Sequence, residues 1–256
     1  MKIATFNANS IRARIELLSD WIKSEQPDIL CLQETKVQDK EFPADRFMDL
    51  GYQVIFKGQK SYNGVAIVSK HPFTDVRLNL QGKEDEQARF ISATIGTVHV
   101  INVYVPQGVA LGTDKFLYKL EWMEDLLSHI KSSCNPGAPI IMTGDFNVAL
   151  EAIDVYDPEG LKGQVGFHPD EQAVVKRFME WGFTDIFRLH HKDGGHYTFW
   201  DYRIPNGFKR RMGWRIDYIF ATRSLAEKST GCRIDTDPRA LEKPSDHTFL
   251  VAEFDF

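Results

Sequence analysis

The chain has 256 residues, of which 43% are apolar and 26% charged, and its formal net charge is −5. This balance is typical of ordinary globular proteins and disfavours disorder, collagen and coiled coil. The sequence contains no run of 18 apolar residues that could span a membrane, so we expect no membrane partner. Because no linker rich in proline, glycine or serine divides the sequence, we expect one domain over residues 1–256.

Short β-rich runs predict strands along most of the chain. In chain order they are residues Ile3–Phe6, Ile29–Gln33, Gln53–Phe56, Val65–Val68, Phe90–Ile95, Val98–Val105, Ile140–Met142, Asp217–Ala221 and Phe249–Phe254. Gly96 and Thr97 separate two of these runs and predict a tight hairpin. Several neighbouring strands look antiparallel, which favours two sheets with helices packed outside over regular βαβ winding.

Three helices are predicted by apolar side chains at helical spacing. The stripes are Ile11, Ile15, Leu18 and Ile22; Phe116, Leu120, Met123, Leu127 and Ile130; and Val174, Val175, Phe178 and Trp181. Gly182 follows the third stripe and is expected to end that helix.

The N-terminal residues and the cysteines indicate a protein of the cell interior. Met1 and Lys2 lead straight into a strand-like run, without the apolar segment of a secretory signal. Cys31, Cys134 and Cys232 are an odd number without metal-like spacing, which is typical of reduced thiols in an intracellular protein. We therefore expect a cytoplasmic protein.

The charge is unevenly distributed. Residues 188–223 hold eight Lys or Arg against three acidic residues, so this window carries +5 and the remainder −10. A local basic face on an acidic protein can bind phosphate groups. A solvated loop surface explains the same charges equally well.

Polar residues follow or precede many of the predicted strands. They are Asn7 and Asn9; Gln33 and Glu34; Asn102 and Tyr104, before Pro106-Gln107-Gly108; Asp145 and Asn147; Asp217; and Ser245-Asp246-His247. Each has an ordinary structural explanation, since asparagine after a strand is usually a turn former and a single glutamate is usually on the surface. If the sheets pack face to face, however, these strand ends can lie along one edge.

Four carboxylates at one edge would repel one another unless a cation lay among them: Glu34, Asp145, Asp217 and Asp246. Hard oxygen ligands with few cysteines or histidines favour Mg²⁺, with Mn²⁺ as a substitute, over zinc. His247 beside them indicates phosphoryl transfer or hydrolysis rather than passive metal storage.

These motifs together resemble the exonuclease III family of apurinic/apyrimidinic endonucleases, within the endonuclease/exonuclease/phosphatase superfamily. The resemblance rests on six blocks in the right order: Asn7; Gln33-Glu34-Thr35; Asn102-Val-Tyr104-Val-Pro106; Gly144-Asp145-Phe-Asn147; Trp214-Arg215-Ile-Asp217; and Ser245-Asp246-His247. It spans nearly the whole chain. It implies a four-layered α/β sandwich, with two mixed β-sheets packed face to face and flanked by helices.

The resemblance also implies a metal site and catalytic roles. Glu34 would be the principal metal ligand, with Asp246, Asn7 and Asn9 nearby. Many family members carry aspartate where this chain has Asn9, which implies a water-mediated contact there. The implied catalytic residues are Asp145 to activate water, Asn147 with Asn7 to hold Asp145 and the phosphate, Asp217 to orient His247, His247 itself, and Tyr104 to bind the scissile phosphate.

Further residues are implied to contact DNA. Gln107 falls where the family has an amide on the DNA backbone, and the segment from Tyr197 to Arg203 resembles a DNA-binding loop. Lys209, Arg210 and Arg211 would contact phosphates. Phe199, Trp214 and Ile216 would wall a small pocket for an abasic sugar; in a strand, alternation would place Trp214 and Ile216 on one face and Arg215 and Asp217 on the other.

The implied mechanism is in-line attack of water on a phosphodiester. Mg²⁺ and an imidazolium can neutralise charge growing on the non-bridging oxygens. Asp217 would raise the pKa of His247, and Asp145 would take a proton from water. Activation of the water by Tyr104 or by a second metal ion is an alternative that the sequence leaves open.

We therefore expect a monomeric, Mg²⁺-dependent DNA-repair hydrolase, nucleoid-associated in a prokaryote, that cuts double-stranded DNA 5′ to abasic sites and trims 3′ ends. One alternative is a phosphodiesterase on the same scaffold that acts on an inositol phosphate or lipid; the aromatic and basic loops, without apolar membrane-docking loops, disfavour it. A second is a non-catalytic DNA-binding module. Clustered carboxylates beside a polyanion disfavour that one.

Overall fold

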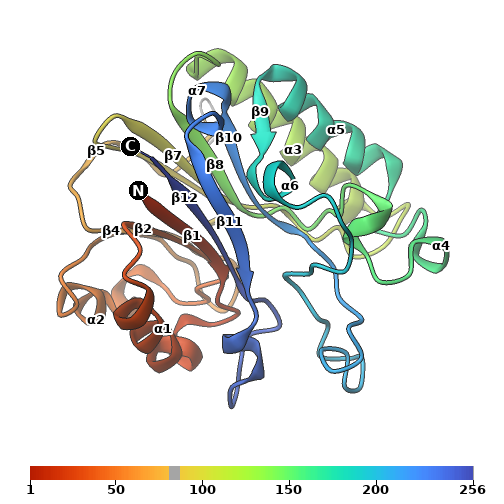
Figure 1. The fold of residues 1–256 in the computed structure, drawn as a ribbon, viewed down its shortest axis with the longest axis horizontal. Coiled ribbons are helices and arrows are strands. Elements are labelled where there is room, and N and C mark those ends of the chain that lie inside the picture. The colour runs from red at the N-terminus through yellow and green to blue at the C-terminus, as the bar shows by residue number, and fades with distance from the viewer. Residues whose placement is uncertain (81–86, 256) are drawn as a thin grey trace.

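The computed structural model describes residues 1–80 and 87–255. Across these residues the strands form two six-stranded sheets (Figure 1). In spatial order, the first sheet contains β11 (Ser229–Asp235), β12 (Phe249–Phe254), β1 (Lys2–Asn7), β2 (Ile29–Gln33), β4 (Val65–Ser69) and β3 (Gln53–Lys57). The second contains β5 (Phe73–Arg77), β6 (Phe90–Ile95), β7 (Val98–Tyr104), β8 (Ile140–Asp145), β10 (Asp217–Thr222) and β9 (Phe183–Asp185).

Alternation of apolar side chains along the central strands builds separate apolar layers. In β1, Ile3 packs into the core between the two sheets, whereas its neighbour Ala4 packs with the residues of α1. In β7, Val100 lies in the same inter-sheet core and Ile101 packs with residues of α3. The sequence therefore produces the predicted four layers, helix on sheet on sheet on helix.

Helices cover the outer face of each sheet (Figure 1). The first sheet is covered by α1 (Ile11–Glu25) and α2 (Ala44–Met48), and the second by α3 (Asp114–Ser133) and α5 (Pro169–Trp181). Three short helices lie in connections: α4 (Pro158–Leu161), α6 (Ile186–His190) and α7 (Arg223–Ala226). Among the described residues, no helix is long and apolar enough to cross a membrane.

The strand directions bring the polar strand ends to one edge. β1 and β2 are parallel, as are β7 and β8, so the carboxyl ends of both pairs point the same way within their sheets. β12 runs antiparallel to β1 and β10 antiparallel to β8, so β12 and β10 begin where their neighbours end. Asp217 consequently lies opposite Asp145. This arrangement confirms that the strand ends converge.

A buried amide ties the two sheets together just below that edge. Asn102, on β7 of the second sheet, donates hydrogen bonds to the carbonyls of Leu32 and Ala66 in the first sheet, both at 2.9 Å. Its own carbonyl accepts from Gln33 at 2.7 Å, and Gln33 also donates to Thr5 at 2.9 Å. Unpaired buried amides are costly, so this network favours one position of the sheets over others.

The hairpin and the three long helices are found as predicted. Ile95 pairs with Val98 across Gly96 and Thr97, and Gly96 has the positive φ of +60° that such a two-residue turn requires. Gly182 follows α5 with φ +139°. The strands differ in their ends: β7 ends one residue before the predicted Val105, and β8 continues past Met142 to Asp145.

Candidate active site

A buried imidazole lies between two buried carboxylates at the shared edge. His247 Nδ1 is 2.8 Å from Asp217 Oδ2, and His247 Nε2 is 3.7 Å from Asp145 Oδ2. The side chains of all three are at most 4% exposed. Asp145 ends β8, Asp217 begins β10 and His247 precedes β12, so three strands of both sheets build the cluster.

Charge and burial shift the pKa values within this cluster. Burial disfavours the charged imidazole, but the carboxylates of Asp217 and Asp145 outweigh it and raise the pKa of His247 to about 10. Burial raises the pKa of Asp145 to about 7, against the opposing effect of His247. At neutral pH, His247 therefore carries a proton and Asp145 can accept one.

Backbone hydrogen bonds hold Asp217 and His247 in place. The amides of Ile216 and Asp217 both donate to the hydroxyl of Thr198 at 3.2 Å. The amide of His247 donates to Ser245 Oγ at 3.2 Å, and Ser245 Oγ donates to the carbonyl of Asn7 at 2.8 Å. Thr198 was not among the residues predicted from the sequence, although it lies inside the Tyr197-to-Arg203 motif.

Two asparagines hold Asp145. Asn7 Nδ2 donates to Asp145 Oδ2 at 2.9 Å and to Glu34 Oε1 at 2.8 Å, and so links the two sheets. The backbone amide of Asn147 donates to Asp145 Oδ1 at 2.8 Å, and its side chain donates to Val105 O at 3.0 Å. Asn147 has φ +53°, a left-handed conformation that asparagine tolerates better than most residues.

Oxygen atoms gather beside this cluster on the side of the first sheet. Lys36 Nζ lies 2.7 Å from Glu34 Oε2 and 2.5 Å from Asn9 Oδ1, and Asn9 Nδ2 donates to Asp246 Oδ1 at 2.9 Å. Burial would raise the pKa of Glu34, but Lys36 and Asn7 outweigh it and lower that pKa below its usual value. Lys36 was not among the residues predicted from the sequence, although it lies two residues after Glu34.

The residues at this position fit a hard divalent cation. Carboxylate and amide oxygens are the donors that Mg²⁺ prefers in proteins. The Lys36 ammonium already lies between the oxygens of Glu34 and Asn9, so the local field favours positive charge there. Asp246 adds a third oxygen side chain at the same place.

The cluster opens into a cavity of about 980 Å³. Most of the predicted site residues line it: Asn9, Glu34, Tyr104, Gln107, Asn147, Phe199, Arg203, Trp214, Ile216, Asp246 and His247. Asn7, Asp145 and Asp217 are buried behind them. The predicted apolar pocket residues therefore lie in the same cavity as the imidazole of His247.

Tyr104 lies at the floor of this cavity as a protonated phenol. Burial, together with the nearby carboxylates of Glu34 and Asp145, raises the pKa of Tyr104 well above its ordinary value. The guanidinium of Arg89 lies 4.8 Å from its ring centre. A phenol with a raised pKa keeps its proton, so it can donate a hydrogen bond but does not take a proton from water.

The basic window 188–223 contributes less surface charge than its sequence indicates. Arg215 is fully buried: its guanidinium lies 2.7 Å from Asp154 Oδ1 and 2.8 Å from Asp185 Oδ2. Arg188 also pairs with Asp154, at 2.5 Å. The charge of Arg215 is therefore neutralised inside the protein, where the side chain holds the segment just before Asp217.

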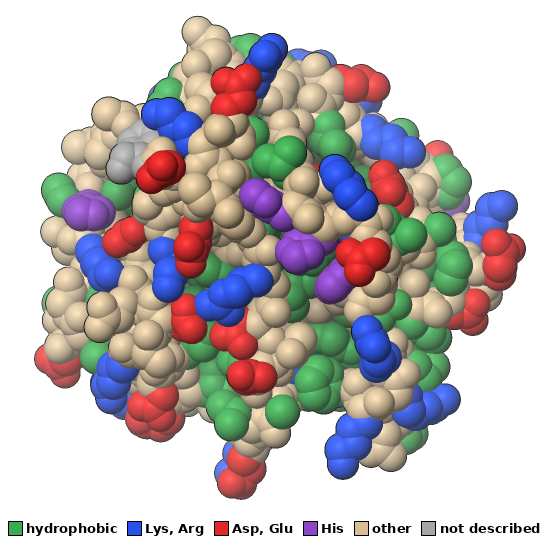
Figure 2. All heavy atoms as spheres, viewed as in Figure 1, with side chains coloured by type: hydrophobic (Ala, Val, Ile, Leu, Met, Phe, Trp, Pro, Cys, Tyr) green, Lys and Arg blue, Asp and Glu red, His purple; other side chains and the backbone are tan. Residues whose placement is uncertain are grey.

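Four of the other cations of the window, Arg203, Lys209, Arg210 and Arg211, lie on a protruding stretch, residues 203–211, which we call the basic segment. Figure 2 shows Lys and Arg side chains gathered on this protrusion, at the lower right of the view. Arg203 pairs with Asp201 at 2.6 Å, and Arg211 donates to the carbonyl of Gly195 at 3.2 Å. Lys209, Arg210 and Arg211 are exposed and do not line the cavity.

A buried ion pair that was not predicted from the sequence supports two loops of the site. Lys119 and Glu171 have fully buried side chains and pair with each other. Lys119 Nζ also donates to the carbonyls of Asn147, at 2.8 Å, and Gln107, at 3.2 Å. The sequence does carry a sign of this burial: Lys119 lies three residues after Phe116 and one before Leu120, and so falls beside the apolar stripe of α3.

The chain is similar to known proteins over nearly its whole length. Residues 4–247 match the endonuclease/exonuclease/phosphatase family. The exodeoxyribonuclease III of Haemophilus influenzae is 36% identical, over 99% of this chain and 100% of that protein. The structure of an AP endonuclease from Archaeoglobus fulgidus is 45% identical, with a TM-score of 0.98 over 100% of both chains. A Neisseria 3′ phosphatase bound to a product DNA hairpin is 38% identical, with a TM-score of 0.96 and full coverage of both chains.

Proposed function

We propose that this chain, which belongs to the endonuclease/exonuclease/phosphatase family, hydrolyses the DNA backbone 5′ to abasic sites and leaves a 3′ hydroxyl. At the level of its relatives, the chain is a hydrolase of the exonuclease III type, a DNA-repair nuclease of a metal-dependent family. The proposal adds the lesion, the position of the cut and Mg²⁺ as the metal, with Mn²⁺ as a substitute.

The observation that carries the proposal is the buried Asp145–His247–Asp217 cluster, whose His247 lines the cavity. Asp145 can take a proton from a water molecule within hydrogen-bond reach. His247, held in its protonated form by Asp217, can place positive charge against the phosphoryl oxygens as they gain charge. The two groups thus have complementary roles: the carboxylates raise the pKa of His247, and burial raises that of Asp145.

The proton acceptor is assigned to Asp145 rather than Tyr104. The pKa of Asp145 is raised to about 7, which suits a base at neutral pH. The pKa of Tyr104 is raised well above its ordinary value, so the phenol keeps its proton and donates a hydrogen bond to the phosphate. Asn147 and Asn7 keep Asp145 oriented toward the phosphate.

Glu34 and Asp246 would hold the Mg²⁺, with Asn7 and Asn9 beside it. When bound, the cation supplies charge that stabilises the scissile phosphate and its leaving oxygen. The ammonium group of Lys36 would then move out of its position between Glu34 and Asn9.

Selectivity for abasic sites is assigned to the apolar wall of the cavity. Phe199 and Trp214 pair through backbone hydrogen bonds of 2.9 Å, and Ile216 follows on the same wall. The ring centre of Phe199 lies 4.8 Å from that of His247, so the wall adjoins the reacting phosphate. A deoxyribose without its base, turned out of the helix, matches such an apolar recess.

Trimming of 3′ ends belongs to the same proposal. One Neisseria relative is described both as a 3′ phosphatase with a product DNA hairpin and as a 3′–5′ exonuclease. A 3′ terminal phosphate presents the same phosphoryl oxygens to Tyr104 and His247 as an internal phosphodiester does. We further propose that the protein acts as a monomer, in the cytoplasm and close to the nucleoid in a prokaryote.

A single substrate tests the function. A duplex labelled at the 5′ end, with one tetrahydrofuran abasic analogue, should be cut just 5′ to the analogue in Mg²⁺ and not in EDTA. Glu34→Gln should lose most of this activity and its response to Mg²⁺. A matched duplex without the lesion measures cutting of intact DNA, and a duplex ending in a 3′ phosphate measures trimming of 3′ ends.

Full activity of Glu34→Gln in EDTA would contradict the metal site. Equal cutting of the intact and the abasic duplex would contradict the proposed lesion choice, while leaving the nuclease itself in place.

A further inference from the structure

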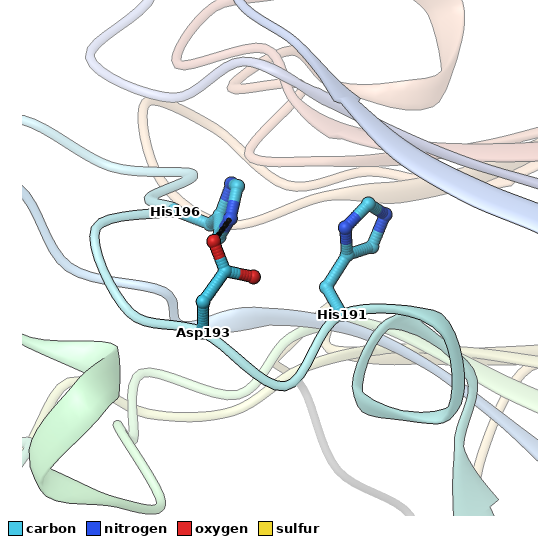
Figure 3. A group of neighbouring side chains, drawn as sticks. All are labelled: His191, Asp193 and His196. Carbon is cyan, nitrogen blue, oxygen red and sulfur yellow. Dashed lines mark hydrogen bonds and ion pairs between the residues drawn. The ribbon is translucent and has the colours of Figure 1, made fainter.

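Three side chains that commonly bind metals lie together in the loop after α6, away from the active site. They are His191, Asp193 and His196, and one donor atom from each lies within 4.8 Å of the others (Figure 3). Their spacing in the sequence is His-x-Asp-x-x-His. The catalytic proposal uses none of them.

The hydrogen bond of His191 leaves one of its ring nitrogens available. His191 Nε2 lies 2.7 Å from the carbonyl oxygen of Cys232. Because a carbonyl only accepts, Nε2 carries the proton, and the neutral ring keeps a lone pair on Nδ1. Figure 3 shows Nδ1 on the side of the ring that faces Asp193 and His196. Histidines that bind metals commonly donate their other N–H to a backbone carbonyl in this way.

The neighbouring residues hold this loop in one conformation. The His191 ring stacks on Phe187, with 4.5 Å between ring centres. Arg188 Nη1 donates to the carbonyls of His191, at 3.2 Å, and Asp193, at 2.6 Å. Arg188 is also paired with Asp154, so its charge is partly neutralised. A metal would therefore meet donors whose backbone is already positioned.

We propose that His191, Asp193 and His196 bind a divalent transition metal of the zinc class, as a site separate from the Mg²⁺ site. Imidazole nitrogen suits zinc, cobalt, nickel or copper, whereas the oxygen donors around Glu34 suit Mg²⁺. His196 Nε2 and Asp193 Oδ2 lie 3.2 Å apart. Two donors on one tetrahedral zinc ion are about 3.3 Å apart, given bonds of about 2.0–2.1 Å.

Binding replaces a proton with the metal. In the metal-free protein, His196 Nε2 and Asp193 Oδ2 share a hydrogen bond. The metal would bind the Nε2 lone pair of the His196 tautomer that carries its proton on Nδ1. The Nε2 proton leaves to solvent if the ring is charged, and is exchanged through solvent to Nδ1 if the ring is neutral. The exposed Asp193 moves toward His191 Nδ1 to close the site. Water fills the fourth position from a neighbouring cavity of about 470 Å³, which His191, His196 and Arg211 line.

Cobalt titration of the full-length protein tests the proposal. Co²⁺ is the probe because tetrahedral cobalt absorbs visible light strongly, and excess Mg²⁺ keeps cobalt from the active site. Wild type and Glu34→Gln should each bind one equivalent, by absorbance and by calorimetry, and zinc should displace the cobalt. His196→Ala and His191→Gln should lower this affinity at least tenfold.

His190→Ala is the matched control. It removes an imidazole one residue before His191 that contacts Ser229 instead of the cluster, and it should bind cobalt like wild type. His196→Gln keeps a polar side chain at this half-buried position, so a loss of binding there with an unchanged melting temperature excludes misfolding as the cause. No cobalt binding by wild type in excess Mg²⁺, or unchanged binding by His196→Ala, would overturn the proposal. Neither result bears on DNA cleavage.

Discussion

The catalytic cluster and the basic segment differ in burial and in the number of partners that each side chain has. His247 is 4% exposed and is held by Asp217 through its ring and by Ser245 through its backbone. Arg210, on the basic segment, is exposed, and its guanidinium makes one long hydrogen bond, of 3.4 Å, to the carbonyl of Pro205. In the proposed function, the buried cluster acts through fixed geometry, whereas the exposed segment would contribute charge whose exact position matters little.

Substitution at the catalytic cluster should have the largest effect. His247→Asn keeps a polar side chain but removes the positive charge beside the phosphate. Because this charge matters most in the transition state, we expect the single-turnover rate on the abasic duplex to fall by about 10³-fold. DNA affinity, measured by fluorescence anisotropy without Mg²⁺, should change little.

His71→Asn is the control, since His71 is exposed and remote from the cavity residues. If affinity fell as much as the rate, His247 would be an anchor for the bound substrate, and its assigned role would be wrong.

The contrast between buried and exposed cations extends to stability. Arg215→Met should leave Asp154 and Asp185 buried without their partner and lower the free energy of unfolding by about 3–5 kcal/mol. Arg210→Met removes the same charge from the surface and should change it by no more than about 0.5 kcal/mol. Urea denaturation of both variants measures the difference. Similar values for the two would mean that the buried network contributes no more than a surface charge.

The architecture was predictable because each central strand carries its own signal. Ile3 and Ala4 alternate between two apolar layers, and the stripe of α3 marks the outer face of its sheet. The missed strands lack such a signal. β5 is mostly exposed, β9 has three residues, and β11 contains Gly231 at an irregularity in its pairing with β12.

The motifs at strand ends predicted that side chains such as Asp145 and His247 lie together, which the structure confirms. The partners that fix them were not predictable, because those contacts join positions far apart in the sequence. Arg215 illustrates this limit: in the sequence it is one of eight cations in a basic window, and only the fold reveals Asp154 and Asp185 around it. Charge counted along a chain does not report which charges reach the surface.

Variants of the apolar wall of the cavity should have an effect on cleavage that is smaller than that of His247→Asn and larger than that of changes in the basic segment. Trp214→Ala and Phe199→Ala enlarge the proposed sugar pocket, since both side chains line the cavity. Each should lower the abasic-site rate and raise relative cutting at intact nucleotides, reducing the ratio of the two rates by about tenfold, as expected for a lost apolar contact.

Initial rates on matched duplexes with and without the lesion give this ratio. Phe208→Ala is the control, because Phe208 is a half-buried aromatic residue of the other cavity. A wild-type ratio in both folded variants would place the sugar pocket elsewhere.

The smallest effect is expected from the basic segment, and it should appear in the salt dependence of binding rather than in the rate constant of cleavage. Each phosphate contact contributes about 0.9 to the slope of log affinity against log salt concentration, because binding releases condensed counterions. Replacing Lys209, Arg210 and Arg211 with alanine should therefore flatten the slope by up to about 2.7, with the cleavage rate at saturating enzyme unchanged.

The matched control replaces Lys115, Lys131 and Lys176, exposed lysines on α3 and α5, and removes the same net charge from a face covering the second sheet. If both triple variants flatten the slope equally, the effect comes from net charge. A flattening confined to the first variant would place DNA along the basic segment.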